Sequence, residues 1–159
     1  RDPDLVRSAF GLKTSEGGLE QVAEDYCREI HSGRRNVLAI DSADRQLLGF
    51  VRYSLRPGPQ GLMARVGILL GARGNRGRGL GTEAMRLLLG YLFEVRRVVM
   101  VELDTADFNR AAQRSFEKAG FRRRRDLGPD PVGQAPSTGS VANKVWMEFP
   151  RDRWDGSAS

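Results

Sequence analysis

The hydrophobic pattern of the chain alternates between the periodicity of helices and that of strands. Apolar residues recur at three- and four-residue spacing in three stretches, which predicts amphipathic helices over about 18–31, 80–94 and 110–118. Short apolar runs bounded by glycine, proline and polar residues predict strands over 36–41, 47–55, 62–70, 97–104, 121–125 and 141–149. Asn109 is a suitable N-cap for the last helix, and Gly120 suits the position after its end.

The order of these elements predicts a domain of the α/β (α+β) class. The strand, helix and strand over 62–70, 80–94 and 97–104 form a right-handed parallel crossover, which leaves the two strands side by side or nearly so. The carboxyl ends of both strands then meet at one edge of the sheet, where open α/β sheets bind ligands. A length of 159 residues suits one domain over 1–159. The Pro-, Gly- and Ser-rich segment 126–140 is either a loop over the site or an inert insertion.

Composition removes several classes of site. The chain has one cysteine and one histidine, so neither an internal disulfide nor a conventional metal site or Ser-His-Asp triad is expected. Helical spacing places Cys27 in the core, and His31 lies near a helix end. No apolar run is long enough to cross a bilayer, which predicts a cytoplasmic protein without membrane contact. The net charge of +6 favours polyanionic ligands without choosing among them.

The segment from Arg73 to Thr82, RGNRGRGLGT, predicts a phosphate site, because it places four glycines and three arginines directly before a helix. A Walker loop requires lysine where this chain has Leu80. A dinucleotide fingerprint from Gly77 meets Thr82 at its third glycine position, although Glu102 lies at about the distance of a ribose-binding acid. The first interpretation fails and the second is weak.

Two motifs resemble the GNAT superfamily of acyl-coenzyme A-dependent N-acetyltransferases. Arg76, Gly79 and Gly81 form R-x-x-G-x-G, which is similar to the superfamily's motif A, and NRAAQRSFEKAGF from Asn109 is similar to its second conserved block. The resemblance covers roughly 36–149. It implies a GNAT fold, with a mixed, twisted central sheet flanked by helices. In pattern, GLGTEAMRLLLGYLF is most similar to the branch that acetylates ribosomal-protein alanine termini.

By the same resemblance, the N-terminus is expected to be truncated. GNAT domains usually begin with a strand and a helix before the region that residues 1–11 resemble, and no such strand is evident in the sequence. A missing edge strand invites pairing with another chain, which leaves a homodimer open.

The resemblance implies transfer of an acetyl group from acetyl-coenzyme A to a primary amine. It also implies the residues that bind the cofactor's pantetheine arm, diphosphate and thioester end: Ile68, Leu69, Leu70, Arg76, Gly77, Arg78, Gly79, Leu80, Gly81, Thr82, Asn109 and Phe116. A helix N-terminus stabilises phosphates through its dipole, which supports the loop part of this set independently.

Catalysis needs an oxyanion donor and a way to neutralise the amine. The amide of Leu69 or Leu70 could donate to the oxyanion. Asp104 ends its predicted strand and matches the position of an Asp base in some aminoglycoside N-acetyltransferases; its alternative role is to cap a turn. Arg65 stands where the ribosomal branch commonly has Glu, and Phe116 stands where the superfamily usually has a Tyr acid.

Three other functions stay open from the sequence. Aminoglycoside acetylation is the enzymatic alternative. A basic nucleic-acid-binding module is disfavoured, because its Arg-Gly cluster is framed by a strand and a helix rather than lying in a disordered segment. The third alternative is a fold that binds cofactor without turnover, given Arg65 and Phe116 at the two catalytic positions.

Overall fold

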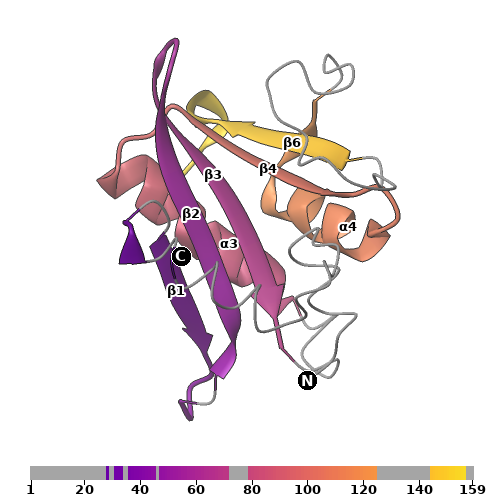
Figure 1. Ribbon diagram of the computed structural model, residues 1–159. Coiled ribbons are helices and arrows are strands. Elements are labelled where there is room, and N and C mark those ends of the chain that lie inside the picture. Colours follow the sequence, from indigo (N-terminus) through magenta and orange to yellow (C-terminus); the bar gives the residue numbers. More distant parts are fainter. Residues whose placement is uncertain are drawn as a thin grey trace.

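A mixed six-stranded sheet forms the centre of the molecule (Figure 1). The computed structural model describes residues 28, 31–33, 36–45, 47–71, 79–124 and 144–156. The sheet has the order β1-β2-β3-β4-β6-β5, with β3 and β4 parallel and every other pair antiparallel. Its strands are β1 (Asn36–Asp41), β2 (Leu47–Gly58), β3 (Gly61–Leu70), β4 (Met100–Ala106), β5 (Arg122–Arg123) and β6 (Lys144–Pro150).

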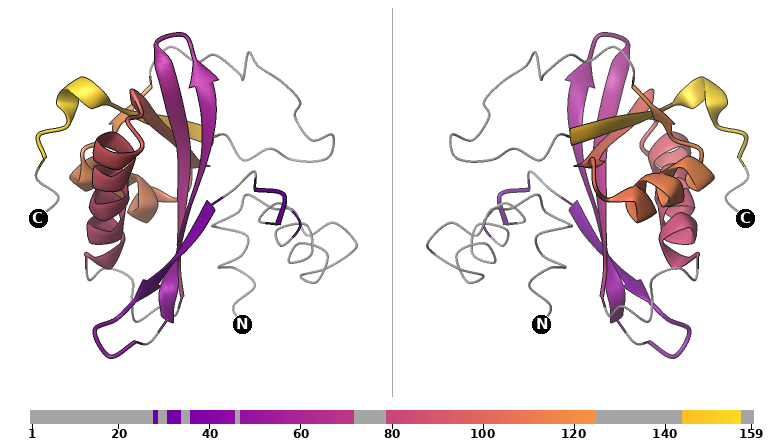
Figure 2. Two further views of the ribbon diagram at one scale, coloured as in Figure 1. Left: turned by 90° about the vertical axis from the view of Figure 1, so that its left-hand side faces the viewer. Right: turned by 90° about the vertical axis from the view of Figure 1, so that its right-hand side faces the viewer.

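Two helices, α3 (Leu80–Gly90) and α4 (Arg110–Ala119), lie on the same face of this sheet (Figure 2). Their apolar sides pack on the inward residues of the strands, and Phe93 and Phe149 contact one another at the centre with ring centroids 5.5 Å apart. The largest fully buried side chains are Phe93, Met85, Leu89, Leu92, Leu103, Met147, Gln113, Val98 and Val101. We call the opposite side the polar face, because Arg56, Arg65, Glu102, Asp104 and Glu148 lie on it.

The two parallel strands separate after a short pairing. β3 and β4 are in register only from Met63 opposite Met100 to Arg65 opposite Glu102. Beyond this point β3 stays paired with β2 to its end, while β4 continues along β6 as far as Ala106. The sheet is therefore divided into two halves that diverge from one vertex, and a cavity forms where the strands part.

The predicted mixed sheet and flanking helices are confirmed, while several boundaries differ. β2 continues to Gly58 instead of ending at Leu55, and a two-residue turn leads into β3. Pro57 is tolerated in β2 because β1 reaches only Tyr53, so no neighbouring strand requires its missing N–H. β4 spans Met100–Ala106 rather than 97–104, and β5 is limited to Arg122–Arg123.

The helix predicted to about residue 94 changes type before its end. After Gly90 the chain forms a π-helix (Tyr91–Val95), in which the Arg96 amide donates to the Tyr91 carbonyl at 3.1 Å. Buried Leu92 and Phe93 keep the spacing of an ordinary helix. The apolar pattern is the same for both helix types, so periodicity alone predicts an uninterrupted α-helix.

Several predictions fall outside the described residues. Arg28 and His31 are helical, and the rest of the helix predicted over 18–31 lies outside, together with Cys27, the segment 126–140 and the N-terminal truncation. The single domain over 1–159 stays a prediction. Within the part of the chain that is described, no helix is long and apolar enough to cross a membrane.

Candidate active site

A cavity of about 480 Å³ occupies the space between the diverging strands. Its walls are the end of β3, the end of β4, the amino end of α3 and one side of α4. Most of the predicted site residues line it: Ile68, Leu69, Leu70, Gly79, Gly81, Thr82, Asp104, Asn109 and Phe116. Leu80 opens α3 without lining the cavity, and Arg76, Gly77 and Arg78 lie outside the described residues.

Alternate residues of β3 direct their backbone N–H and C=O groups toward the cavity. The Gly71 amide donates to the Leu48 carbonyl at 2.7 Å, and the Val99 amide donates to the Leu62 carbonyl at 2.8 Å. Because the β2–β3 register has no shift, odd-numbered residues of β3 bond to β2 and even-numbered ones face the side of β4. Of the two amides considered as oxyanion donors, that of Leu70 therefore turns toward the cavity and that of Leu69 toward β2.

The amino end of α3 meets the same cavity. Gly79 is the residue before the helix, with φ of 80° and no side-chain cap, so the first amides of the helix are left for another acceptor. A Cβ on Gly81 would lie 3.4 Å from both Leu70 Cδ1 and Ser115 Oγ. The small residue thus keeps space open between β3 and α4. Helix-start amides without a side-chain cap, together with the positive end of the helix, favour an anion at this position.

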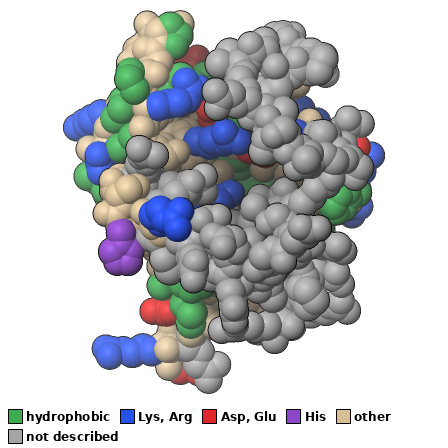
Figure 3. Space-filling model, in the orientation of Figure 1, with side chains coloured by type: hydrophobic (Ala, Val, Ile, Leu, Met, Phe, Trp, Pro, Cys, Tyr) green, Lys and Arg blue, Asp and Glu red, His purple; other side chains and the backbone are tan. Residues whose placement is uncertain are grey.

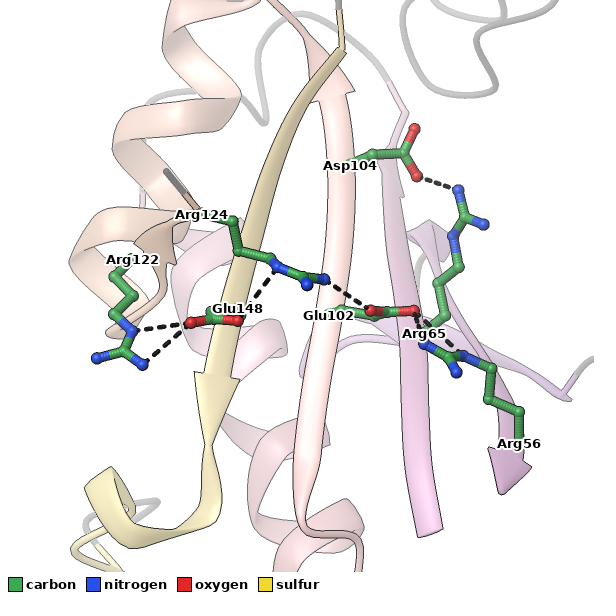
Figure 4. A network of polar contacts seen from close by, with 7 residues as sticks. All are labelled: Arg56, Arg65, Glu102, Asp104, Arg122, Arg124 and Glu148. Atoms are coloured by element: carbon green, nitrogen blue, oxygen red, sulfur yellow. Dashed lines mark hydrogen bonds and ion pairs between the residues drawn. The ribbon is translucent and has the colours of Figure 1, made fainter. Parts of the chain in front are cut away.

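Asp104 and its partners stand near the vertex, on the polar face (Figure 4). Arg65 from β3 donates to one carboxylate oxygen of Asp104, and Lys144 Nζ lies 3.3 Å from the other. The Arg65 guanidinium also lies 4.7 Å from the centre of the Trp146 ring. Arg65 is thus held by two strands besides its own, and both oxygens of Asp104 face a cation.

The charge around Asp104 determines its protonation. Burial by itself raises the pKa of this carboxyl, but the hydrogen bonds and charges of Arg65 and Lys144 outweigh burial and hold the pKa below its usual value. Asp104 is therefore ionised at neutral pH. Its ion pairs stabilise the fold at any pH above the unfolded pKa of about 3.9, and this contribution is lost as pH falls through the lowered folded value.

Glu102, the weak candidate for a ribose-binding acid, has a different role. It is only 4% exposed and does not line the cavity. Arg56 Nη2 lies 2.8 Å from one of its oxygens and Arg124 Nη1 lies 3.5 Å from the other, while Arg124 also reaches Glu148 at 3.4 Å (Figure 4). Glu102 is therefore part of an ion-pair chain that crosses the strands, and the dinucleotide interpretation loses its acidic residue.

Gln113 was missed by sequence reasoning, although it secures the loop between β4 and α4. The side chain is fully buried, and its Nε2 donates to the carbonyls of Ala106 at 3.1 Å and Asp107 at 2.9 Å. Its Oε1 accepts from Arg123 at 2.9 Å. A signal was present, because Gln113 occupies the same helical face as apolar Phe116. These bonds fix the turn that follows Asp104.

We expect Gln113→Met to lower the free energy of unfolding by about 1–3 kcal/mol, because two loop carbonyls lose their buried donor and the guanidiniums of Arg123 and Arg110 lose their acceptor. Urea denaturation measures this change. Gln113→Glu tests the amide donors separately: it keeps an acceptor for Arg123 but puts a carboxylate oxygen against the two loop carbonyls, so it should also be destabilised. A Met variant as stable as the parent would show that the loop does not depend on Gln113.

Phe116 combines packing with a place in the cavity wall. Its ring packs edge-on against Phe121 at 6.1 Å, and only 6% of the residue is exposed. It has no ionisable group, so any proton for a leaving group must come from elsewhere.

In the space-filling view of the polar face, Lys and Arg side chains outnumber Asp and Glu among the coloured residues (Figure 3).

Comparisons with known proteins show which family and which relatives this chain is similar to. A family model described as an acetyltransferase (GNAT) domain matches residues 1–122. Aminoglycoside N(6')-acetyltransferase type 1 from Klebsiella pneumoniae is 33% identical over 89 residues, which are 56% of this chain and 40% of that protein. A kanamycin resistance protein from Rhizobium radiobacter is 43% identical over 47 residues, 30% of this chain and 44% of that protein. The chain thus spans less than half the length of these curated relatives.

Among solved structures, spermidine N-acetyltransferase from Vibrio cholerae in complex with CoA and spermine superposes with a TM-score of 0.70. The match covers 93% of this chain and 83% of that chain at 20% sequence identity. At this identity the likeness shows a shared fold.

Proposed function

Because this chain belongs to the GNAT family of acetyltransferases, we propose that it transfers an acetyl group from acetyl-coenzyme A to a primary amine. The observation that carries the proposal is the cavity, which connects the uncapped amino end of α3 to the strand-end carboxylate of Asp104. One end of this space suits phosphates and the other suits a reacting amine.

The residues present fit acetyl-coenzyme A as the acyl donor. Amides of Gly81 and Thr82 at the start of α3 would bind the diphosphate, as would Arg76 and Arg78, which lie outside the described residues. The edge of β3 at Val66, Ile68 and Leu70 offers backbone groups to the amide groups of pantetheine. The volume is within the usual range for small-molecule sites, about 300–1,000 Å³.

The proposed reaction is direct attack of a neutral amine on the thioester carbonyl. A bond forms between nitrogen and carbon while the carbonyl oxygen becomes an oxyanion, to which a cavity-facing backbone amide of β3 donates. The carbon–sulfur bond then breaks, and the proton lost by nitrogen is taken by Asp104 or by water. Thiols have pKa values near 8.5, so thiolate leaves without an obligatory acid, which fits Phe116 in place of Tyr.

Arg65 and Lys144 determine which catalytic role Asp104 can take. A lowered pKa weakens a carboxylate as a base, since proton transfer from a lysine-like ammonium of pKa ~10.4 is strongly uphill. The same carboxylate remains negative and lies in the cavity wall, so it would attract the acceptor and stabilise the positive nitrogen formed by attack. We propose that Asp104 provides base assistance through this charge, with greatest effect on acceptors of high pKa.

For the acceptor we propose a small-molecule amine. The curated relatives act, by their names, on aminoglycosides, and the superposed structure is that of a spermidine N-acetyltransferase. Protein N-termini remain the alternative, favoured by the pattern of residues 79–93. Asp104 is a carboxylate in the cavity wall that could attract an amine of either kind.

A thiol-release screen tests the proposed function. Full-length protein is incubated with acetyl-coenzyme A and one of three acceptors, an aminoglycoside, spermidine or an N-terminal peptide, with an acceptor-free reaction as control. We expect thiol release above the control with at least one amine. Cofactor binding without release in any reaction would favour a non-catalytic fold, and RNA binding without cofactor binding would favour the nucleic-acid alternative.

Phe116→Tyr is expected to leave the turnover number within a small factor of the parent. Tyr adds a hydroxyl to a ring that already packs in the cavity wall, and thiolate departure does not require its proton. Steady-state thiol release gives the comparison, with Phe116→Leu as the control for lost ring packing. A hundredfold rise in turnover would mean that protonation of the leaving thiolate limits the reaction.

A further inference from the structure

One side of α4 presents two cations to the cavity. Arg114 and Lys118 are one helical turn apart, and both line the cavity together with Ala111 and Ser115 of the same helix face. Neither cation is used by the mechanism above, because the reacting end of the site is at Arg65 and Asp104, on the other side of the sheet.

Contacts between the helices place these cations beside the start of α3. Thr82 Oγ1 lies 3.2 Å from Ser115 Oγ, and one turn farther along both helices Arg86 donates to the Lys118 carbonyl at 2.9 Å. The helices therefore run alongside each other in the same direction, and Arg114 precedes the residue that touches the first turn of α3. The amides that would bind a diphosphate and the two α4 cations belong to one end of the cavity.

Among the described residues, no carboxylate contacts either of these two side chains. Within the described residues, neither Arg114 nor Lys118 makes an ion pair or a side-chain hydrogen bond. The nearest acidic residue in sequence, Glu117, is bound by Arg123 at 3.0 Å. Two like charges one turn apart repel each other, and an anion between them would remove that cost. Arg110, at the start of the same helix, differs from them because it lies outside the cavity wall and contacts Gln113.

We propose that Arg114 and Lys118 bind the 3'-phosphate of coenzyme A and so select it over the dephosphorylated form. The inference rests on the proposed function, which places the thioester at the vertex and the diphosphate at the start of α3. The part of the molecule that follows the diphosphate, a ribose with a 3'-phosphate and an adenine, must then lie at the outer end of the cavity. Arg114 and Lys118 are the α4 cations that line the cavity, and the contacts of Ser115 and Lys118 with α3 put them beside the helix whose start would bind the diphosphate.

Binding measurements with two ligands test this assignment directly. Coenzyme A and 3'-dephospho-coenzyme A are titrated by calorimetry against the parent, Arg114→Gln, Lys118→Gln and the double variant. Arg110→Gln is the matched control, because it removes the same charge from the same helix outside the cavity. Circular dichroism and thermal melting establish that each variant is folded.

We expect the parent to bind coenzyme A roughly 1.5- to fivefold more tightly than its dephosphorylated form for each exposed ion pair made. Each single variant should reduce this preference, the double variant should abolish it, and Arg110→Gln should preserve it. The preference of the parent should fall as salt rises, since exposed charges are screened.

The outcomes separate this inference from the proposed function. Equal losses for both ligands would overturn the inference while leaving the function intact, because Arg114 and Lys118 would then act on the diphosphate or through general charge. Tight binding of both forms by the parent without preference would also overturn it. Failure of the parent to bind either ligand would instead contradict the acetyltransferase proposal itself.

Discussion

Asp104→Asn is expected to lower turnover by ~10²-fold or more for an acceptor of high pKa, while the affinity for acetyl-coenzyme A stays nearly unchanged. The variant keeps the size of the side chain and loses its charge. The side chain between Arg65 and Lys144 then presents no negative group to the amine. Thiol release measured from pH 6 to 9 should show the loss shrinking as pH rises, because more of the amine is then neutral without assistance. An acceptor with an α-amine of pKa near 8 should lose less at every pH.

Glu117→Gln is the matched control for this experiment. It removes one carboxylate from an exposed pair with Arg123, outside the cavity, and should leave turnover unchanged. A loss in Asp104→Asn that is equal for both acceptors and independent of pH would make Asp104 a structural or orienting residue. Solvent would then be the better candidate for the base.

Gly79→Glu is expected to abolish the stabilisation of the fold by acetyl-coenzyme A. In the parent, a ligand at about one hundred times its Kd adds about 2.7 kcal/mol to the native state. For a domain of this size that is a rise of roughly 5–10 °C in Tm. Glutamate would place a negative charge at the start of α3, where we propose that the phosphates bind, and would strain a residue whose φ is 80°.

Gly79→Asn separates charge from backbone strain. Asparagine tolerates positive φ better than other side chains, and apart from the residue itself and its two chain neighbours, no heavy atom of the described residues lies within 4 Å of the Cβ it would add. We expect this variant to keep most of the ligand-induced rise in Tm. Thermal melts with and without millimolar acetyl-coenzyme A give both values. The assignment of α3 as the phosphate site fails if Gly79→Glu still shows the full rise.

The core of the fold followed from periodicity and from two motifs, while the boundaries depended on tertiary contacts. The strand, helix and strand from 61 to 106 were predictable because apolar spacing and the glycine loop occur in sequence order. The π-helix at Tyr91–Val95 was not, since its side chains keep the spacing of an α-helix. The continuation of β2 through Pro57 was also hidden, because it depends on where β1 ends.

For the site, the sequence indicated which residues gather but not how they pair. Leu70, Gly81 and Asp104 were all placed in the cavity wall as expected. The pairing of Arg65 with Asp104 could not be foreseen, because it requires the register of β3 against β4. From the sequence, Arg65 is only the residue that replaces a glutamate. In the structure, its charge helps to hold the pKa of the Asp104 carboxyl below its usual value.

The early parting of β3 and β4 has a consequence for amide hydrogen exchange. Past the Arg65–Glu102 pair, the even-numbered residues of β3 face the side that β4 has left, so among the described residues the amides of Ile68 and Leu70 lack the inter-strand bonds that slow exchange in a closed sheet. A pantetheine arm bound there would act as a surrogate strand. Deuterium uptake at the amides of Ile68 and Leu70 should then slow on cofactor binding, whereas Gly67 and Leu69, already bonded to β2, should change little.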